Sequence, residues 1–271
     1  MSPACPSSSC FIGSEGTLGI ITEAVLRLIP PQRPPATLVA TFASLDAAAA
    51  AVLDITRRMR PSMLEFMDRT SIGAVEDVTS MGLDRTAEAL LVIQSDEPGA
   101  TAAEEIAEIE KWCQAHSASE IFATDDPATG EQFVMARRMA IPAVEKRGAL
   151  LLEDVGVPIP QLGALVRGIA GIAGQRAVEI AVIAHAGDGN THPLIVCDRS
   201  DADQIARAEV AYGEVMELAI RLGGTITGEY GVGRLKKPWL GRYIGADALA
   251  LNERIKDALD PARILNPGAI F

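Results

Sequence analysis

The order of strand and helix patterns between residues 36 and 124 restricts the folds open to this chain. Short apolar, β-branched runs predict strands, and amphipathic or alanine-rich stretches between them predict helices. The strand candidates are residues 37–42, 63–67, 89–94 and 120–123, and the helix candidates are residues 46–59, 69–78 and 101–116, with Asp46 as a candidate N-cap. Apart from the short middle helix, this is the order of a split βαβ, or ferredoxin-like, α+β sheet.

The pattern continues after residue 124 with further helices and strands. We expect helices at residues 130–147, 161–173, 201–222 and 247–259, and strands at residues 149–158, 177–184 and 194–197. The helix at residues 201–222 is the most regular, because its apolar residues fall on one face and Ser200 or Asp201 can cap its start.

The composition is that of a folded protein, and the net charge argues against two kinds of partner. Hydrophobic residues make up 48% and charged residues 22% of the 271 residues, which is typical of globular proteins. A net charge of −12 argues against nucleic acid and anionic membranes as partners. The four cysteines are scattered and form no C-x-x-C pair, which favours a reduced, cytoplasmic environment. No apolar run is long enough to predict a transmembrane segment.

The first 35 residues divide into three parts. Residues 1–10 are rich in serine and proline, lack the pattern of a secretory signal, and predict a disordered lead-in. Residues 11–29 contain a glycine-rich turn followed by an alternating strand at residues 24–29. The turn could bring backbone amides to a phosphate or ring, or it could be an ordinary loop. The proline-rich residues 30–35 predict a stiff linker and a domain boundary.

Two of the three histidines, His185 and His192, lie seven residues apart around a Gly-Asp-Gly-Asn turn. A buried strand pattern precedes this turn, and Glu229 follows a second short β-branched run among glycines. Two imidazoles and one carboxylate suit Zn²⁺, Mn²⁺ or Fe²⁺ acting as a Lewis acid. The alternative is that both histidines are ordinary polar loop residues.

Arg137 and Arg138 form a second candidate site, close to Pro142. Such a pair could bind a carboxylate through a bidentate fork, or it could be simply solvated. The five glycines in residues 224–233 indicate close backbone approach to another group, and the apolar tail at residues 260–271 is expected to dock on a surface.

Four motifs together resemble the FAD-linked oxidases of the vanillyl-alcohol-oxidase type. They are residues 11–22, 185–193, 224–233 and 260–271, which occur in the order of the family and span nearly the whole chain. Within the family, the resemblance is to the group of D-lactate dehydrogenases, glycolate oxidases and D-2-hydroxyglutarate dehydrogenases. It implies oxidation of a 2-hydroxy acid by hydride transfer from the α-carbon to flavin.

The resemblance also implies a domain plan. Residues 11–35 would be the end of an FAD-binding domain and its linker, and residues 36–245 a ferredoxin-like cap that covers the substrate. Residues 246–271 would form a C-terminal helix and tail that return to the FAD domain.

The family's functional residues carry over onto matching positions of this chain. The implied metal ligands are His185, His192 and Glu229, and the implied catalytic residues are Arg137, which would face the substrate carboxylate, Asn190 near the flavin, and Tyr230. The implied FAD contacts are Gly13, Ser14, Gly16, Thr17, Gly19, Ile20, Ile21 and Asn266.

Two departures from the family pattern define the alternatives. Tyr230 stands where the family has a histidine that is expected to be the general base, and tyrosine, with a pKa of about 10, is a poor base at neutral pH. The family's N-terminal half, which makes most FAD contacts, is expected to be supplied by a separately encoded partner. The alternatives are an inactive remnant, or a metal- or carboxylate-binding module without redox activity.

Overall fold

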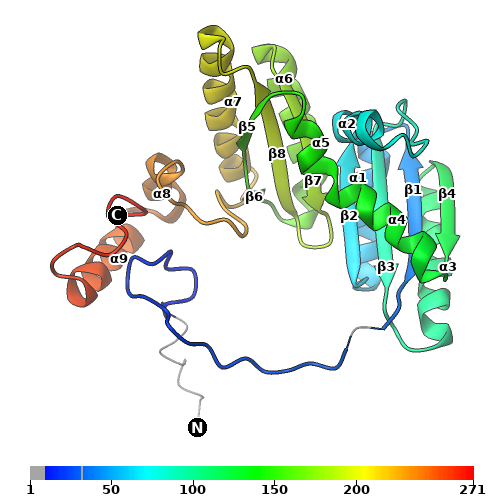
Figure 1. Cartoon of the computed structure of the whole chain (residues 1–271), viewed down its shortest axis with the longest axis horizontal. Helices are drawn as coiled ribbons and strands as arrows, with labels where there is room; N and C mark the ends of the chain where they lie inside the picture. Colours follow the sequence, from blue (N-terminus) through cyan, green and yellow to red (C-terminus); the bar gives the residue numbers. More distant parts are fainter. Residues whose placement is uncertain (1–9, 32) are drawn as a thin grey trace. The chain divides into compact units, whose positions relative to one another are not determined.

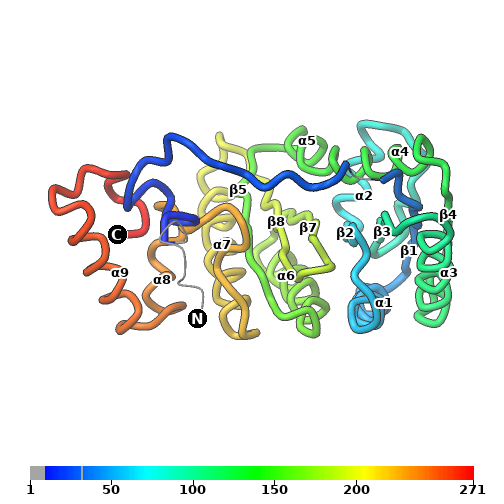
Figure 2. Tube along the Cα trace, turned by 90° about the horizontal axis from the view of Figure 1, so that it is seen from below, coloured from blue at the N-terminus to red at the C-terminus, as the bar shows by residue number. Residues whose placement is uncertain are grey.

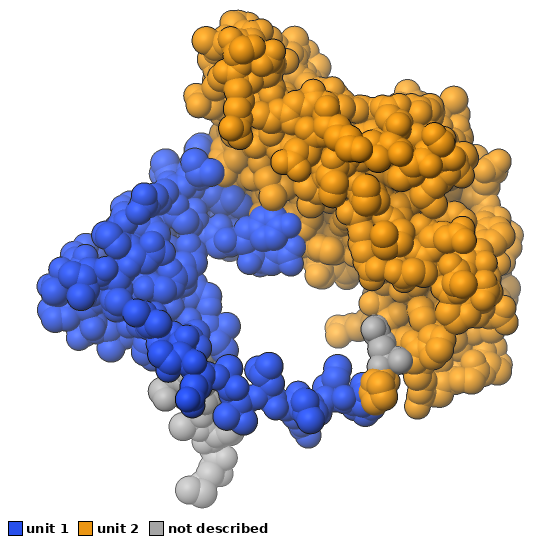
Figure 3. Space-filling view, viewed as in Figure 1, with its two compact units in different colours: residues 1–30, 225–271 blue, residues 31–224 orange. Residues whose placement is uncertain are grey.

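The computed structural model describes residues 10–31 and 33–271 of the chain, so most of the expected disordered lead-in, residues 1–9, lies outside the described residues. Two compact units make up the chain, and Figure 3 shows each in its own colour. Unit 1 comprises Met1–Pro30 and Thr225–Phe271, and unit 2 comprises Pro31–Gly224. The domain boundaries implied by the resemblance at residues 35 and 245 are a different division and stay a prediction.

Unit 2 is built on an antiparallel sheet whose strand order is β4-β1-β3-β2-β7-β8-β5 (Figure 1). The first four strands are β1 (Ala36–Phe42), β2 (Met63–Asp68), β3 (Ala89–Ser95) and β4 (Ala118–Thr124). Their arrangement, with β1 between β4 and β3, is the split βαβ sheet predicted from the sequence. The α+β fold class is therefore confirmed.

The second part of the sheet consists of β5 (Ala149–Leu152), β6 (Val155–Gly156), β7 (Glu179–His185) and β8 (Asn190–Cys197). It joins the first part where Glu65, Phe66 and Met67 of β2 pair with residues 183–185 of β7. The single strand expected at residues 149–158 is two short strands that keep one register along β8, with the break opposite Pro193, which has no N–H for the ladder.

Helices cover both faces of this sheet (Figure 2). One face carries α1 (Leu45–Arg58), α3 (Ala100–Ala115), α6 (Leu162–Arg176) and α7 (Ala202–Arg221), which pack as neighbours in the order α3-α1-α6-α7. The other face carries α2 (Arg69–Thr79), α4 (Pro127–Arg138) and α5 (Ala140–Glu145). A core that includes Val39, Met67, Leu90 and Ile183 lies between these three helices and the sheet.

Three local predictions were wrong. The strand expected at residues 24–29 does not form, and its apolar side chains are exposed, because no strand of the described chain pairs with it. The helix expected at residues 130–147 is broken after Arg138, since Pro142 has no N–H for the Arg138 carbonyl. Ser44, not Asp46, caps α1 by accepting a hydrogen bond from the Ala47 N–H.

Unit 1 contains α8 (Lys237–Ile244), which was not predicted, and α9 (Ala246–Leu259). Its organising group is the ammonium of Lys256, a residue that is only 3% exposed. This ammonium donates to the carbonyls of Thr17 (2.7 Å) and Leu265 (2.9 Å) and pairs with Asp260 (2.5 Å). The N-terminal loop, α9 and the tail are thereby joined, and the Ile270 N–H reaches the Gly233 carbonyl at 3.0 Å.

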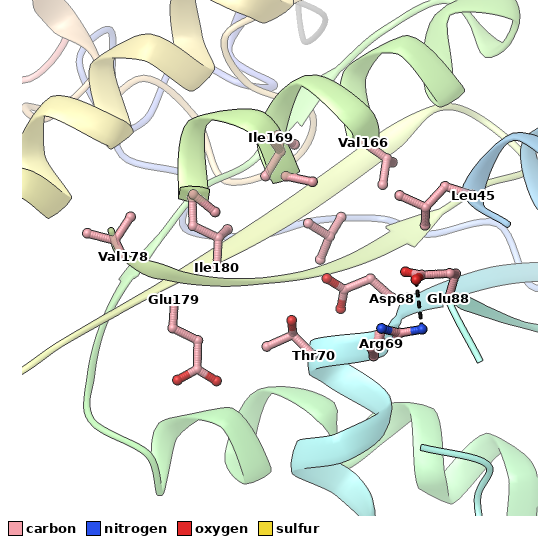
Figure 4. A pocket seen from close by; sticks show the side chains of 13 residues that line it. Leu45, Asp68, Arg69, Thr70, Glu88, Val166, Ile169, Val178, Glu179 and Ile180 are labelled. Atoms are coloured by element: carbon pink, nitrogen blue, oxygen red, sulfur yellow. Dashed lines mark ion pairs between the residues drawn. The ribbon is translucent and has the colours of Figure 1, made fainter. Parts of the chain in front are cut away.

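A cavity of about 280 Å³ lies in unit 2 where β2 and β7 stop pairing (Figure 4). Its apolar wall includes Val166 and Ile169 of α6, and Arg69 and Glu88 form an ion pair at its edge. Asp68 lines this cavity and caps α2 by accepting a hydrogen bond from the Ser71 N–H at 2.8 Å. Burial raises the pKa of Asp68 from 3.8 to about 6.

The raised pKa of Asp68 predicts a pH-dependent stability. The folded state holds the Asp68 proton more tightly than the unfolded state, so stability falls as pH rises from about 4 to about 6. We expect Asp68→Asn, which keeps a good N-cap, to remove this loss of about 2 kcal/mol when urea unfolding is measured at pH 4.5 and 7. In Asp84→Asn the loss of stability with rising pH should persist, because Asp68 is unchanged. A hydrogen bond from Thr86 lowers the pKa of Asp84, so Asp84 does not contribute to this loss. Parallel profiles for wild type and Asp68→Asn would contradict the prediction.

Replacing Lys256 tests the organisation of unit 1. Lys256→Met removes the donor that joins Thr17, Asp260 and Leu265, so amide hydrogen exchange in residues 10–17 and 260–271 should accelerate at least about tenfold. Lys237→Met, which changes an exposed lysine of the same unit, is the matched control and should leave exchange unchanged. Equal exchange in the two variants would show that the Lys256 contacts do not hold unit 1 together.

Candidate functional site

Polar side chains gather on the α4 and α5 face of unit 2, where β2, β7 and β8 run side by side. Glu65 of β2 is opposite His185 of β7, which is in turn opposite Asn190 of β8. His192 is opposite Ile183, two residues before His185. Because side chains two apart on a strand share a face, this register brings all four residues to one side of the sheet. Arg137 approaches the same side from the last turn of α4.

The carboxylate of Glu65 is shared by His185 and Arg137. Its Oε1 lies 2.7 Å from His185 Nδ1, and its Oε2 lies 2.8 Å from Arg137 Nη2. The side chains of Glu65 and Arg137 are each only 11% exposed. The contact with His185 is a hydrogen bond, and the contact with Arg137 is an ion pair that lacks hydrogen-bond geometry. Two residues predicted to act at the site, His185 and Arg137, are therefore joined through a third that the sequence did not single out.

The two predicted histidine ligands of unit 2 lie next to each other. The ring centroids of His185 and His192 are 5.2 Å apart, and the rings are nearly perpendicular. His192 is almost fully buried, and its Nδ1 lies 3.8 Å from Asp154 Oδ1. The hydrogen bond between His185 Nδ1 and the buried Glu65 carboxylate is typical of a histidine that binds a metal through Nε2. Asp154 is the nearby acid on the Nδ1 side of His192.

Sequence reasoning missed the buried acids Glu65, Glu153 and Asp154. Their signal was a carboxylate within or directly after an apolar strand run, where a charge is costly unless it has partners. Glu153 and Asp154 affect the neighbouring Tyr212 of α7. Burial, together with these two carboxylates, raises the pKa of the Tyr212 phenol above its ordinary value.

A tight turn between β7 and β8 fixes the positions of His185 and Asn190. Gly189 has a φ of +84°, and a Cβ there would lie 2.1 Å from the Val157 carbonyl oxygen, so the turn requires glycine. Asp188 Oδ1 accepts the Asn190 N–H at 2.9 Å. The Asn190 side-chain oxygen is buried without a hydrogen-bond partner among the described residues, so it could accept a hydrogen bond from a ligand.

A cleft of about 590 Å³ in unit 2 reaches Glu65 and His185. Its lining includes residues 59–64, which lead from α1 into β2, together with Ile159, Gly187 and Asp188. Glu65 and His185 thus line a cleft at the end of the β2–β7 ladder.

The predicted FAD contacts belong to unit 1. Gly13 and Gly16 have positive φ values, and no atom lies within 4 Å of a Cβ built on either, so their backbone is open to close approach. Ser14 donates to the Phe11 carbonyl and Thr17 to the Ser14 carbonyl, which closes the loop on itself. Further along, a Cβ on Gly19 would lie 2.9 Å from the Phe11 ring, and Ile20 and Ile21 are exposed.

Glu15 explains part of the glycine-rich segment at residues 224–233. Its carboxylate accepts the N–H groups of Val232 (2.6 Å) and Gly233 (2.7 Å), and a Cβ on Gly231 would lie 2.5 Å from its Oε1. Asn266 donates from Nδ2 to the Glu15 carbonyl at 2.6 Å, so the structure brings this predicted FAD contact to the N-terminal loop. Glu15 itself was not identified from the sequence, because its partners are more than 200 residues away.

Glu229 and Tyr230 lie in unit 1 and are exposed. The turn that carries them is closed by a hydrogen bond of 2.8 Å from the Gly231 N–H to Thr227 Oγ1. The predicted site residues are therefore distributed over both units, with Arg137, Asn190, His185 and His192 in unit 2. Their roles stay predictions.

Sequence relatives match nearly the whole chain. Glycolate oxidase subunit GlcD from Bacillus subtilis is 38% identical over 263 residues, covering 96% of this chain and 56% of the relative. The protein of the same name from Escherichia coli K12 is 34% identical, covering 98% and 54%. D-lactate dehydrogenase from Archaeoglobus fulgidus is 31% identical, covering 96% and 57%. The chain spans about half the length of these relatives.

Solved structures with the same fold include 4-ethylphenol oxidase from Gulosibacter chungangensis, with a TM-score of 0.68 at 14% identity, covering 88% of this chain and 54% of that one. p-Cresol methylhydroxylase follows with a TM-score of 0.66 at 12% identity, covering 89% and 53%. At these identities the likeness concerns the fold alone.

None of the helices in the described part of the chain has the length and apolar character needed to cross a bilayer. The family model for the C-terminal domain of FAD linked oxidases matches residues 32–270. The chain therefore belongs to the FAD-linked oxidases and carries their C-terminal domain.

Proposed function

We propose that this chain is the substrate-binding part of an FAD-dependent oxidoreductase that oxidises a small 2-hydroxy acid, such as D-lactate, glycolate or D-2-hydroxyglutarate. The observation that carries the proposal is the Glu65-bridged pair of His185 and Arg137, with His192 beside it. Imidazoles that can bind a metal, next to a guanidinium that can bind a carboxylate, match the two functional groups of a 2-hydroxy acid. The names of the relatives, glycolate oxidase and D-lactate dehydrogenase, support the same substrate class.

His185 and His192 would hold a divalent metal, Zn²⁺, Mn²⁺ or Fe²⁺, with Glu229 as the third ligand. The contact of His185 Nδ1 with Glu65 fits this role, because a proton on Nδ1 leaves the ring's lone pair on Nε2. Glu229 follows shortly after Gly224, the last residue of unit 2. When bound, such a metal acidifies a coordinated hydroxyl group.

The protein's own residues would orient the substrate. Arg137 is held by Glu65 through one terminal nitrogen, and its planar fork can donate to a substrate carboxylate as well. The partnerless oxygen of Asn190 can accept a hydrogen bond from the substrate or the flavin. Tyr230 would act as a hydrogen-bonding residue, because a phenol with a pKa of about 10 is a poor base when a metal can acidify the hydroxyl group.

FAD would lie against the N-terminal loop of unit 1, where it would accept the hydride. The open backbone at Gly13 and Gly16, together with Asn266 beside the same loop, fits a flat ligand that approaches closely. Most FAD contacts would come from a partner that corresponds to the other half of the relatives. The exposed apolar side chains between Ile20 and Ile29 suit pairing with such a partner.

A cytoplasmic location fits the proposal. Cys113 and Cys197 are buried free thiols, and burial raises the pKa of Cys113 to about 12, so this thiol stays protonated. Buried, unpaired cysteines are typical of reducing compartments.

The metal site is tested on the purified chain by metal titration. We expect about one equivalent of Zn²⁺ or Mn²⁺ to bind in isothermal calorimetry, and His185→Ala to weaken binding at least about 100-fold. His116→Ala is the matched control, because His116 is the third histidine of the chain and contacts Asp54, away from the cluster. Equal affinities of wild type and His185→Ala would contradict the proposed metal site.

The redox activity is tested by adding FAD and a separately expressed FAD-binding half of a relative. We expect flavin absorbance that bleaches anaerobically on addition of D-lactate, glycolate or D-2-hydroxyglutarate, because hydride transfer reduces the flavin. Arg137→Met should raise the acid concentration needed for half-maximal bleaching at least about tenfold. Bound flavin that none of the three acids bleaches would contradict the proposed activity.

A further inference from the structure

We infer that Glu65 is a positioning residue that holds His185 and Arg137 together and so couples the metal site to the carboxylate site. The inference deepens the proposed function and rests on it for the identity of the two ligands. It is carried by the two contacts of the Glu65 carboxylate, 2.7 Å to His185 Nδ1 and 2.8 Å to Arg137 Nη2. Each oxygen serves a different predicted site residue.

The contact with His185 fixes a tautomer. A carboxylate accepts a hydrogen bond only, so the ring nitrogen that faces it must carry the proton. His185 is thereby held with the proton on Nδ1, in an orientation set by the β2–β7 register that places Glu65 opposite His185. A carboxylate behind a metal-binding histidine typically changes metal affinity by about 10- to 100-fold.

The contact with Arg137 sets the position of the guanidinium. Arg137 lies in the last turn of α4, and its helix position alone leaves this long side chain with many rotamers. The ion pair with Glu65 selects one of them, in which the guanidinium lies beside the strand that carries His185. A single carboxylate therefore determines the relative position of the two groups that would grip the substrate.

The packing of the core around Glu65 does not require a carboxylate at this position. Met67, two residues along β2 on the same face, and Val92, opposite Glu65 on β3, are buried apolar residues, and an apolar side chain at position 65 would avoid the desolvation of a charge. Glu179 on β7 provides the contrast. It also pairs with an arginine, Arg147, at 2.6 Å, but with much greater exposure and no histidine.

The test uses the full chain and the variants Glu65→Gln and Glu179→Gln. The tautomer of His185 is read at pH 8 from the ¹⁵N shifts of its ring, which are resolvable because the chain has three histidines. We expect an Nδ1–H ring in wild type and Glu179→Gln, and loss of this preference in Glu65→Gln. Hydrogen exchange at the Arg137 guanidinium should accelerate only in Glu65→Gln. Zn²⁺ titration should show about 10- to 100-fold weaker binding in that variant alone.

The outcomes separate this inference from the proposed function. An Nε2–H ring in wild type, or Zn²⁺ affinity unchanged in Glu65→Gln while His185→Ala abolishes binding, would overturn the role of Glu65 and leave the metal site intact. An Nδ1–H ring that depends on Glu65, in a chain that binds no Zn²⁺, would support the positioning role and overturn the proposed metal site. A uniform loss of thermal stability in Glu65→Gln, with tautomer and guanidinium exchange unchanged, would show a merely structural role.

Discussion

A carboxylate buried in an inner strand of an antiparallel sheet is the constraint on which the candidate site depends. Glu65 occupies a position where the ladder and the adjoining core are otherwise apolar, and such a charge persists in a fold only with strong partners. It obtains them from an imidazole across the ladder and a guanidinium on the covering helix. The contacts of Glu65 therefore depend on both the strand register and the position of the end of α4. A one-residue slip of β2 would turn Glu65 to the opposite face and break both contacts.

The site also lies where the two parts of the sheet meet. The ferredoxin-like part contributes Glu65 on β2, and the second part contributes the histidines and Asn190 on β7 and β8. The β2–β7 ladder is only three residues long, so the strands diverge on one side of it into the cavity beside Asp68. On the other side, the ladder ends at Glu65 and His185, where a cleft opens. Because the β2–β7 ladder is short, both of its ends are accessible. The polar cluster lies at the end that is next to the turn between β7 and β8.

Local patterns in the sequence predicted most of the helices and strands of unit 2 and the histidine pair. Apolar periodicity located the strands of the split βαβ sheet, and the Gly-Asp-Gly-Asn turn placed His185 and His192 on either side of a turn, which the structure shows to be a β7–β8 hairpin. Glu65 and Glu15 were missed for a shared physical reason: their partners are, respectively, 120 and more than 200 residues away. Residues 24–29 failed in the opposite way. Their alternation is a real strand signal, but a strand forms only where another strand supplies its hydrogen bonds, and none of the described residues does so.

The same reasoning explains the character of unit 1. Among its described residues, only Ile226, Leu240 and Ala269 are buried hydrophobic side chains, while Ile20, Val25, Leu28, Ile29 and other apolar residues are exposed. Polar contacts therefore hold this unit: Lys256 joins the N-terminal loop to the tail, and Glu15 ties the glycine-rich segment to the same loop. Contacts of this kind specify geometry well, but they add little net stability compared with apolar burial. The uncovered apolar segment of unit 1 is a surface that a partner could cover. This supports the proposal that an FAD-binding partner, by covering residues 20–29, completes the fold of unit 1 and the cofactor site together.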